Sequence, residues 1–157
     1  MTIDVNTPSN ADRLWVVADK IRFLGNLPGS PIELLDIEVP AGSGTPPHTH
    51  EAAELFYVLE GDLTVRQFGS EIPPVVIHAG PGTSVTIPSR VPHNYVNESG
   101  KPVRMLVMLE ASMVAFFRDI GSAEPASGVP DFARIGAAME RHGIEALASA
   151  GLKPHSS

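Results

Sequence analysis

The sequence predicts an all-β protein, an antiparallel sandwich or barrel, that ends in a short helical tail. From Leu14 to about Leu109 the chain is a series of apolar runs of about four to eight residues, rich in Val, Ile, Leu, Phe and Tyr. Turn signals such as NLPGS, LEGD and HAGPGT separate these runs. The 15 prolines and 14 glycines lie mostly between the runs, as strand ends require. Short, regularly spaced strands of this kind favour a sandwich or a barrel.

Each apolar run is expected to form one strand. In chain order the nine runs cover residues 14–17, 21–24, 32–39, 54–60, 62–68, 74–79, 84–88, 93–97 and 103–110.

The pattern changes to a helical one after Glu110. Residues 113–121 (MVAFFRDIG) predict a short helix that Gly121 stops, and a Pro/Ser/Gly linker follows over residues 122–130. The next segment, DFARIGAAMERHG, predicts a helix from the N-cap Asp131 to the stop at Gly143.

One face of this second helix is apolar, because Phe132, Ile135 and Met139 recur at three- and four-residue spacing. IEALASAG, residues 144–151, is expected to continue the helix. A tail this small cannot form its own core, so it must pack on the β-domain or on a partner subunit.

These patterns divide the chain into four parts: a flexible N-terminus (1–12), a β-barrel domain (13–112), a C-terminal helical extension (113–150) and a disordered tail (151–157).

The composition excludes several classes of protein. The net charge is −7, from 11 Lys and Arg against 18 Asp and Glu, which argues against nucleic-acid or anionic-membrane binding. The absence of cysteine rules out disulfides and thiolate metal sites. No apolar stretch approaches the roughly 20 residues that span a bilayer. The N-terminus shows no secretory signal, so a cytoplasmic protein is expected.

Residues 46–54, PPHTHEAAE, place three potential metal ligands close together. His48 and His50 share one face of a strand, and Glu54 keeps the same parity. Imidazole and carboxylate ligands suit divalent Fe, Mn, Ni, Co, Cu or Zn without selecting among them. On these residues alone, two histidines that merely face solvent are an equally good interpretation.

The spacing around them decides between the two interpretations. Gly42, His48, His50, Glu54 and Gly61 form one group, and Gly82, Pro88, His93 and Asn97 form a second. This arrangement resembles the two-part signature of the cupin superfamily over roughly residues 14 to 110.

The resemblance implies a double-stranded antiparallel β-helix, the jelly-roll barrel, with a metal inside it held by His48, His50, Glu54 and His93. Three His and one Glu leave coordination positions open, as in catalytic sites.

Arg90 is the one departure from the signature, which has glycine there. Because such a glycine often supplies positive φ, arginine is expected to force a slightly different turn. Arg90 is either an exposed turn residue or a group at the barrel mouth that attracts an anionic substrate.

Three further residues are candidates for the substrate pocket. Phe56 shares parity with Glu54, and Tyr95 with His93, so both side chains point inward, where they either line a pocket or fill the core. Gln67 is placed to approach the metal from a neighbouring strand.

Within the superfamily, the chain is similar to single-domain bacterial cupins described as quercetin 2,3-dioxygenase-like. The similarity rests on PPHTHEAAELFYVLEGDLTV and AGPGTSVTIPSRVPHNYVNESGKPVRMLVM, with FFRDIG and RHGIEAL in the tail. It implies a metal-dependent dioxygenase that acts with O2 on an aromatic enol or flavonol, with Glu54 as both ligand and catalytic base. A non-catalytic cupin that binds a small molecule and a metal-dependent sugar or keto-acid isomerase remain alternatives.

A homodimer is also expected, because a jelly roll leaves edge strands that need covering. Residues 14–17 or 21–24 would supply that pairing.

Overall fold

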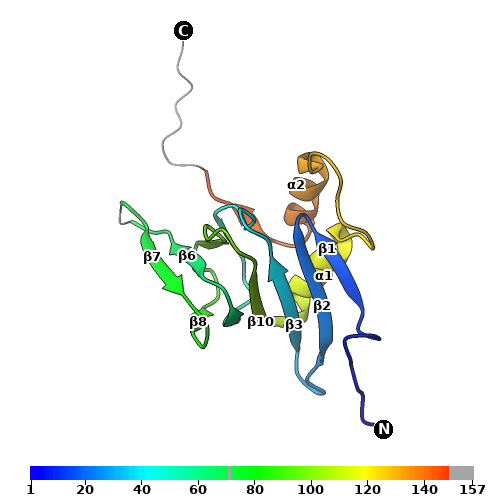
Figure 1. Ribbon diagram of the computed structural model, residues 1–157. Coiled ribbons are helices and arrows are strands. Elements are labelled where there is room, and N and C mark those ends of the chain that lie inside the picture. The colour runs from blue at the N-terminus through cyan, green and yellow to red at the C-terminus, as the bar shows by residue number, and fades with distance from the viewer. Residues whose placement is uncertain (71, 149–157) are drawn as a thin grey trace.

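The computed structural model describes residues 1–70 and 72–148, which form two facing antiparallel sheets and two helices (Figure 1). The six-stranded sheet has the order β1-β2-β3-β10-β5-β8, and the five-stranded sheet the order β11-β4-β9-β6-β7. The elements are β1 (Arg13–Val16), β2 (Asp19–Asn26), β3 (Ile32–Val39), β4 (His48–Thr49), β5 (Glu54–Glu60), β6 (Leu63–Gln67), β7 (Val75–Ala79), β8 (Ser84–Ile87), β9 (His93–Val96), β10 (Val103–Glu110), α1 (Ala111–Ile120), α2 (Phe132–Arg141) and β11 (Glu145–Ala146).

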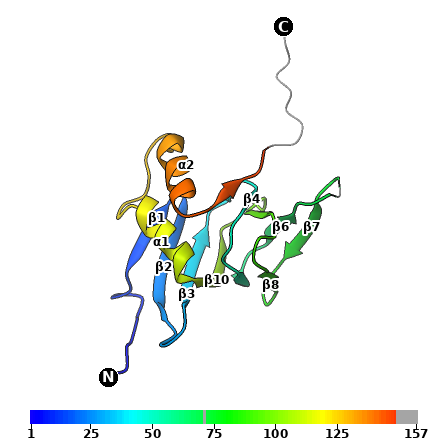
Figure 2. The same cartoon turned by 180° about the vertical axis from the view of Figure 1, so that it is seen from behind.

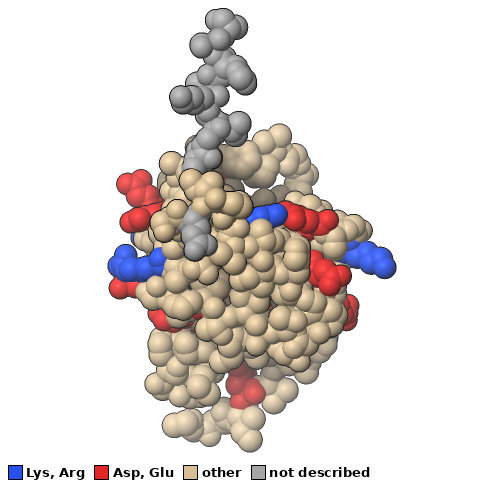
Figure 3. Space-filling view, turned by 90° about the vertical axis from the view of Figure 1, so that its left-hand side faces the viewer, with Lys and Arg blue, Asp and Glu red and all other residues tan. Residues whose placement is uncertain are grey.

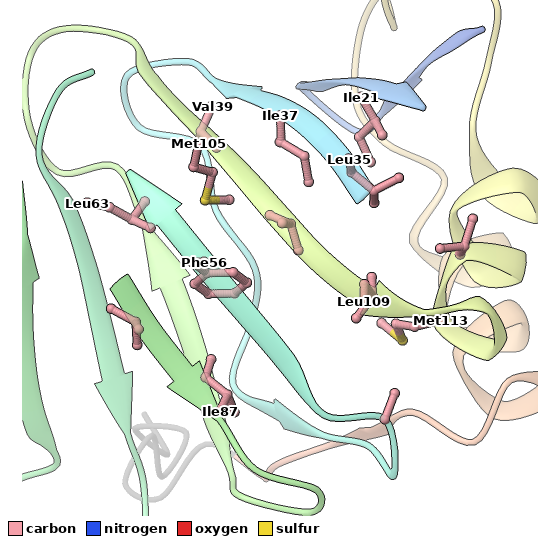
Figure 4. Close-up of a cluster of buried hydrophobic side chains, with 14 of the residues drawn as sticks. Ile21, Leu35, Ile37, Val39, Phe56, Leu63, Ile87, Met105, Leu109 and Met113 are labelled. Carbon is pink, nitrogen blue, oxygen red and sulfur yellow. The ribbon is translucent and has the colours of Figure 1, made fainter. Parts of the chain in front are cut away.

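The jelly-roll prediction is confirmed, and each of the nine apolar runs overlaps a strand. The core lies between the sheets because inward residues alternate with outward ones along each strand. In β5, Phe56 is 2% exposed while its neighbour Tyr57 is 41% exposed. Phe56 lies among side chains from several strands and α1; those labelled with it in Figure 4 are Ile21, Leu35, Ile37, Val39, Leu63, Ile87, Met105, Leu109 and Met113.

The glycines of the signature are explained by backbone conformation. Gly42, Gly61 and Gly82 have φ values of +80°, +82° and +82°, the left-handed region that glycine enters without steric cost. Gly61 also lies very close to the neighbouring main chain. A Cβ on Gly61 would lie only 2.6 Å from the carbonyl oxygen of Pro102, so no side chain fits there.

Arg90 has the backbone conformation that glycine usually supplies. Its φ is +64°, so the arginine adopts the left-handed conformation itself and does not avoid it, contrary to the expectation that it would force a different turn. The hydrogen bond from the Arg90 amide to the carbonyl of His50, at 2.8 Å, holds this turn against the first half of the signature.

Both predicted helices are present. α1 ends at Gly121, whose amide bonds the carbonyl of Phe117, and α2 begins after Asp131, whose side chain accepts a hydrogen bond from the Arg134 amide. Phe132 does not belong to the packed face of α2, since it is 69% exposed.

The prediction that the helix continues through residues 144–151 is wrong. Gly143 has φ +69° and stops the helix, and β11 then pairs with β4 (Figure 2, where the orange-red strand leaves α2). The predicted disordered tail, residues 151–157, lies outside the described residues.

Acidic and basic side chains are scattered around the rim of the face in Figure 3, and no cluster of Lys and Arg is seen on it. Within the described chain, no helix is both long enough and apolar enough to cross a membrane.

Candidate metal centre

The two halves of the histidine pattern meet inside the fold. His48 in β4 pairs directly with His93 in β9, and Glu54 begins β5 on the opposite sheet. One ligand atom from each of His48, His50, Glu54 and His93 lies within 4.8 Å of the others, and all four residues are at most 9% exposed. The four predicted ligands therefore form one buried cluster.

The main chain fixes the orientation of all three imidazole rings. Nδ1 of His48 donates to the carbonyl of Pro46 at 2.7 Å, Nδ1 of His50 to that of Ala52 at 2.8 Å, and Nδ1 of His93 to that of Val91 at 2.8 Å. A carbonyl oxygen can only accept, so Nδ1 carries the proton in each ring. In a neutral ring, Nε2 then carries a lone pair that can bind a metal.

This donor set fits a divalent transition metal. Three Nε2 atoms and a carboxylate converge, and Nε2 of His93 lies 2.7 Å and Nε2 of His50 3.3 Å from Oε1 of Glu54. Among the described residues, no hydrogen-bond partner reaches the buried Nε2 of His50. A cation placed between these buried groups would satisfy them, and nitrogen with oxygen ligands suits the divalent metals from Mn to Zn.

The pKa values of two ligands favour metal binding near neutral pH, and that of a third opposes it. Burial lowers the pKa of His48 to about 4, so its ring is neutral. Burial alone would raise the pKa of Glu54, but its contacts with His50 and His93 outweigh that effect and lower it to about 2. A neutral imidazole and an ionised carboxylate are the forms that bind metals. Burial works to lower the pKa of His50, but the contact with Glu54 outweighs burial and raises it, so a proton competes with the metal at that ring.

An apolar cavity adjoins the cluster. Its volume is about 110 Å³, well above the about 10–15 Å³ that one water molecule needs. The four ligands contribute to its wall, and the helices cover it. The covering side chains are Met113, Phe116, Phe117 and Ile120 from α1, Ile135 and Met139 from α2, and Ile144 beyond α2. The helical tail thus packs on the β-domain and forms part of the cavity wall.

The other predicted site residues lie in different places. Tyr95 lines the cavity, and Phe56 packs edge-on against its ring at 5.7 Å within the core. Gln67 lies beside His93 in the sheet register and lines a second cavity between the sheets. The side chain of Arg90 is 69% exposed and reaches Glu51, with 3.6 Å between Nη2 and Oε1.

Sequence reasoning missed Asp19, which is 6% exposed and lines the cavity. The signal was present in the strand pattern, because Asp19, Ile21 and Phe23 alternate with outward residues and all three are buried. Sequence reasoning likewise did not identify the helix residues that line the cavity.

Comparisons with known proteins agree with this geometry. A family model described as a cupin domain matches residues 35–109, a range that holds all four cluster residues. No curated protein matches the chain.

Several solved structures share the fold. An RmlC-like cupin from Shewanella frigidimarina is 18% identical with a TM-score of 0.59, over 70% of this chain and 92% of that one. The polyketide cyclase RemF from Streptomyces resistomycificus is 25% identical with a TM-score of 0.58, over 70% and 80%. KdgF from Halomonas sp. is 17% identical with a TM-score of 0.57, over 69% and 94%.

Proposed function

Because this chain is a member of the cupin superfamily, we propose that it is a metal-dependent enzyme, a dioxygenase that acts with O2 on an aromatic enol of the flavonol type. The observation that carries the proposal is the convergence of three Nε2 atoms and one carboxylate on the wall of an apolar cavity. Such a cavity excludes water and suits a flat, apolar substrate.

The protein groups have separate roles in this proposal. His48, His50 and His93 would hold the metal, and a bound divalent ion would supply Lewis acidity toward an enol oxygen and a site for O2. Glu54 is ionised at neutral pH, the state in which it can accept the proton of the substrate hydroxyl. Phe116, Phe117 and Met113 would pack against the rings of the substrate and keep water out.

A Glu54→Gln variant tests the base assignment. Glutamine keeps the size and an oxygen that can bind metal but cannot take a proton, so turnover should fall by at least about a hundredfold while substrate affinity changes little. Metal content should be measured by elemental analysis, and O2 uptake with a panel of flavonols. A Glu54→Gln protein with full metal and full activity would refute the base role.

The metal requirement has its own test. The chain should be loaded in turn with Fe, Mn, Ni, Co, Cu and Zn and assayed for O2 uptake. If no loaded form consumes O2 with any aromatic enol, the dioxygenase proposal is wrong.

The similarity to the polyketide cyclase supports a second candidate, a conversion at the same cluster that does not consume O2. Product formation under anaerobic conditions separates the two, because only the non-oxidative reaction would proceed. A sugar or keto-acid isomerase fits less well, since the helix side chains that cover the cavity are all apolar. A protein that only binds its ligand would give saturable binding and no product.

A further inference from the structure

Asp19 is a buried carboxylate that the proposed chemistry does not use. It lies at the start of β2, is 6% exposed, and lines the same cavity as the metal cluster. Within residues 1–70 and 72–148, no Lys, Arg or His forms an ion pair with it. Burying a carboxylate without a cation is unfavourable, and a core built only for stability would place an apolar residue there.

Two hydroxyl groups orient the Asp19 carboxylate. Oγ of Ser43 donates to Oδ1 at 2.7 Å, and the hydroxyl of Tyr95 donates to Oδ2 at 2.5 Å. A carboxylate has about four lone-pair positions, so two acceptor positions remain on a group that faces the cavity.

Tyr95 itself is held firmly by the main chain. Its carbonyl accepts from the Thr45 amide at 2.9 Å, its amide donates to Oγ1 of Thr45 at 3.2 Å, and its ring packs on Phe56. The Ser43–Asp19–Tyr95 group is therefore preorganised, as binding groups need to be.

The loop before Asp19 is strained at the cavity wall. Val17 has φ +57°, which is rare for a β-branched residue, and it lines the cavity two residues before Asp19. Strained residues of this kind gather at functional sites.

We propose that Asp19, oriented by Ser43 and Tyr95, binds a hydroxyl group of the substrate, at a second polar point in the cavity separate from the metal cluster. The inference rests on the proposed function in treating the cavity as the substrate site. It narrows the substrate to an apolar ring system with one enol or phenol oxygen for the cluster and a second hydroxyl for Asp19.

A neutral hydroxyl suits this group better than an ammonium does, because most of the cavity lining is apolar and an ammonium would lose its hydration there. Burial raises the pKa of Asp19, although the hydrogen bonds from Ser43 and Tyr95 oppose that effect.

The first experiment measures dissociation constants on metal-loaded protein without O2. The probes are 3-hydroxyflavone and a set of derivatives that each carry one extra hydroxyl at a different ring position. At least one derivative should bind about ten- to a hundredfold more tightly than the parent compound, the ratio expected when a buried polar group gains a hydrogen-bond partner that it otherwise lacks. Asp19→Ala should abolish that preference and leave the affinity of the parent compound nearly unchanged.

Matched variants separate binding from structure. Tyr95→Phe keeps the ring and should reduce the preference by less than Asp19→Ala does, and Ser43→Ala should behave similarly. Asp62→Ala, which removes an exposed carboxylate elsewhere, should leave the preference intact. Thermal unfolding of each variant reports any loss of fold.

A second experiment needs neither metal nor turnover. Ligand-observed NMR compares phenol, toluene and benzylamine on the metal-free chain, and phenol should bind better than toluene in the wild type but not in Asp19→Ala. If phenol does not bind, if its preference survives in Asp19→Ala, or if benzylamine is preferred, the hydroxyl assignment is wrong. If the protein does not consume O2 but still prefers the hydroxylated derivative over 3-hydroxyflavone and phenol over toluene, only the dioxygenase proposal is overturned.

Discussion

Gly44 lies between the left-handed turn at Gly42 and the strand β9 that carries His93. A Cβ at Gly44 would lie 2.3 Å from the carbonyl oxygen of Tyr95 and 2.7 Å from the Cα of Val96. Both are backbone atoms that cannot rotate away, so even a methyl group would push the loop off β9.

Gly44→Ala is therefore expected to destabilise the protein by about 1–3 kcal/mol, as overpacking does. Urea unfolding measures this change. Gly100→Ala is the control, because Gly100 is exposed and a Cβ there meets nothing within 4 Å, so its free energy of unfolding should change little. Equal stability of the two variants would contradict the close approach at Gly44.

Arg90→Gly should stabilise the protein by up to about 1 kcal/mol. The left-handed conformation costs a non-glycine residue about 1–2 kcal/mol, and the greater freedom of glycine in the unfolded chain offsets part of the gain. Thermal unfolding at matched pH measures the change. A clear loss of stability would mean that the contact between Arg90 and Glu51 contributes more than an exposed ion pair normally does.

At the level of single residues, the four cluster residues could be predicted because their spacing, together with that of the signature glycines, resembles the cupin signature, which implies these ligands. Asp19 could not be found in the same way. It lies outside the signature, and an aspartate beside a turn is usually exposed. Its burial continues the alternation of Ile21 and Phe23 along β2, but the apolar run begins only at residue 21, so the sequence does not show that the strand starts at Asp19.

Asp36 links three strands on the outer face of the larger sheet. It accepts hydrogen bonds from Arg22 in β2 at 2.8 Å and from Arg104 in β10 at 3.1 and 2.7 Å. Burial works to raise the pKa of Asp36, but the two guanidinium groups outweigh it and lower the pKa below 3.8.

Asp36→Asn should therefore cost about 1–2 kcal/mol near pH 7, where the carboxylate is ionised and the lost bonds are charge-assisted. Because the folded-state pKa is depressed, this contribution is present above the unfolded pKa and disappears as the pH falls through the folded one. The difference between variant and wild type should shrink as the pH is lowered from 7 through the folded-state pKa, measured by urea unfolding at neutral and at acid pH.

Glu98→Gln supplies the comparison for an exposed pair. Glu98 binds Arg66 with 46% of its side chain exposed, so its loss should change stability by less than about 0.5 kcal/mol at either pH. A pH-independent effect of Asp36→Asn would contradict the ionic origin of its contribution.

Among the elements, long runs were predicted well and short ones were not. The runs at 32–39, 54–60 and 103–110 coincide with β3, β5 and β10 because each is a long apolar run bounded by turn residues. β4 and β11 have two residues each, too few to show a periodic pattern of apolar residues in the sequence. IEALASAG has strong helix formers, but Glu145 and Ala146 pair with the otherwise unpaired edge of β4, and this tertiary contact overrides propensity.

For the whole molecule, metal binding and stability should be coupled. The cluster brings together a buried Nε2 and a carboxylate, so a cation that binds only the folded state will stabilise it. A metal present at about 100 times its dissociation constant should add about 2.7 kcal/mol, seen as a rise in Tm that EDTA reverses. A His93→Ala variant should lose most of this rise. No shift with any divalent transition metal would contradict the cluster as a metal site.

The expected homodimer stays a prediction at this scale. β1 is the edge of the larger sheet, but Trp15 already exchanges two hydrogen bonds of 2.9 Å with Ser122 along that edge. Pairing between copies through β1 would have to displace or bypass this contact. Light scattering on the wild type and on Trp15→Ala tests whether the edge is used.

The three bonds from Nδ1 to main-chain carbonyls have a consequence for anyone who wishes to move the site into another protein. The partners of the rings are the carbonyls of Pro46, Ala52 and Val91, and no side chain of those residues takes part. Grafting the four ligand side chains alone would not fix which nitrogen of each imidazole ring carries the proton. A successful transplant must copy the path of three loop segments, before β4, between β4 and β5, and between β8 and β9, and sequence alignment of the receiving protein would not reveal whether it had done so.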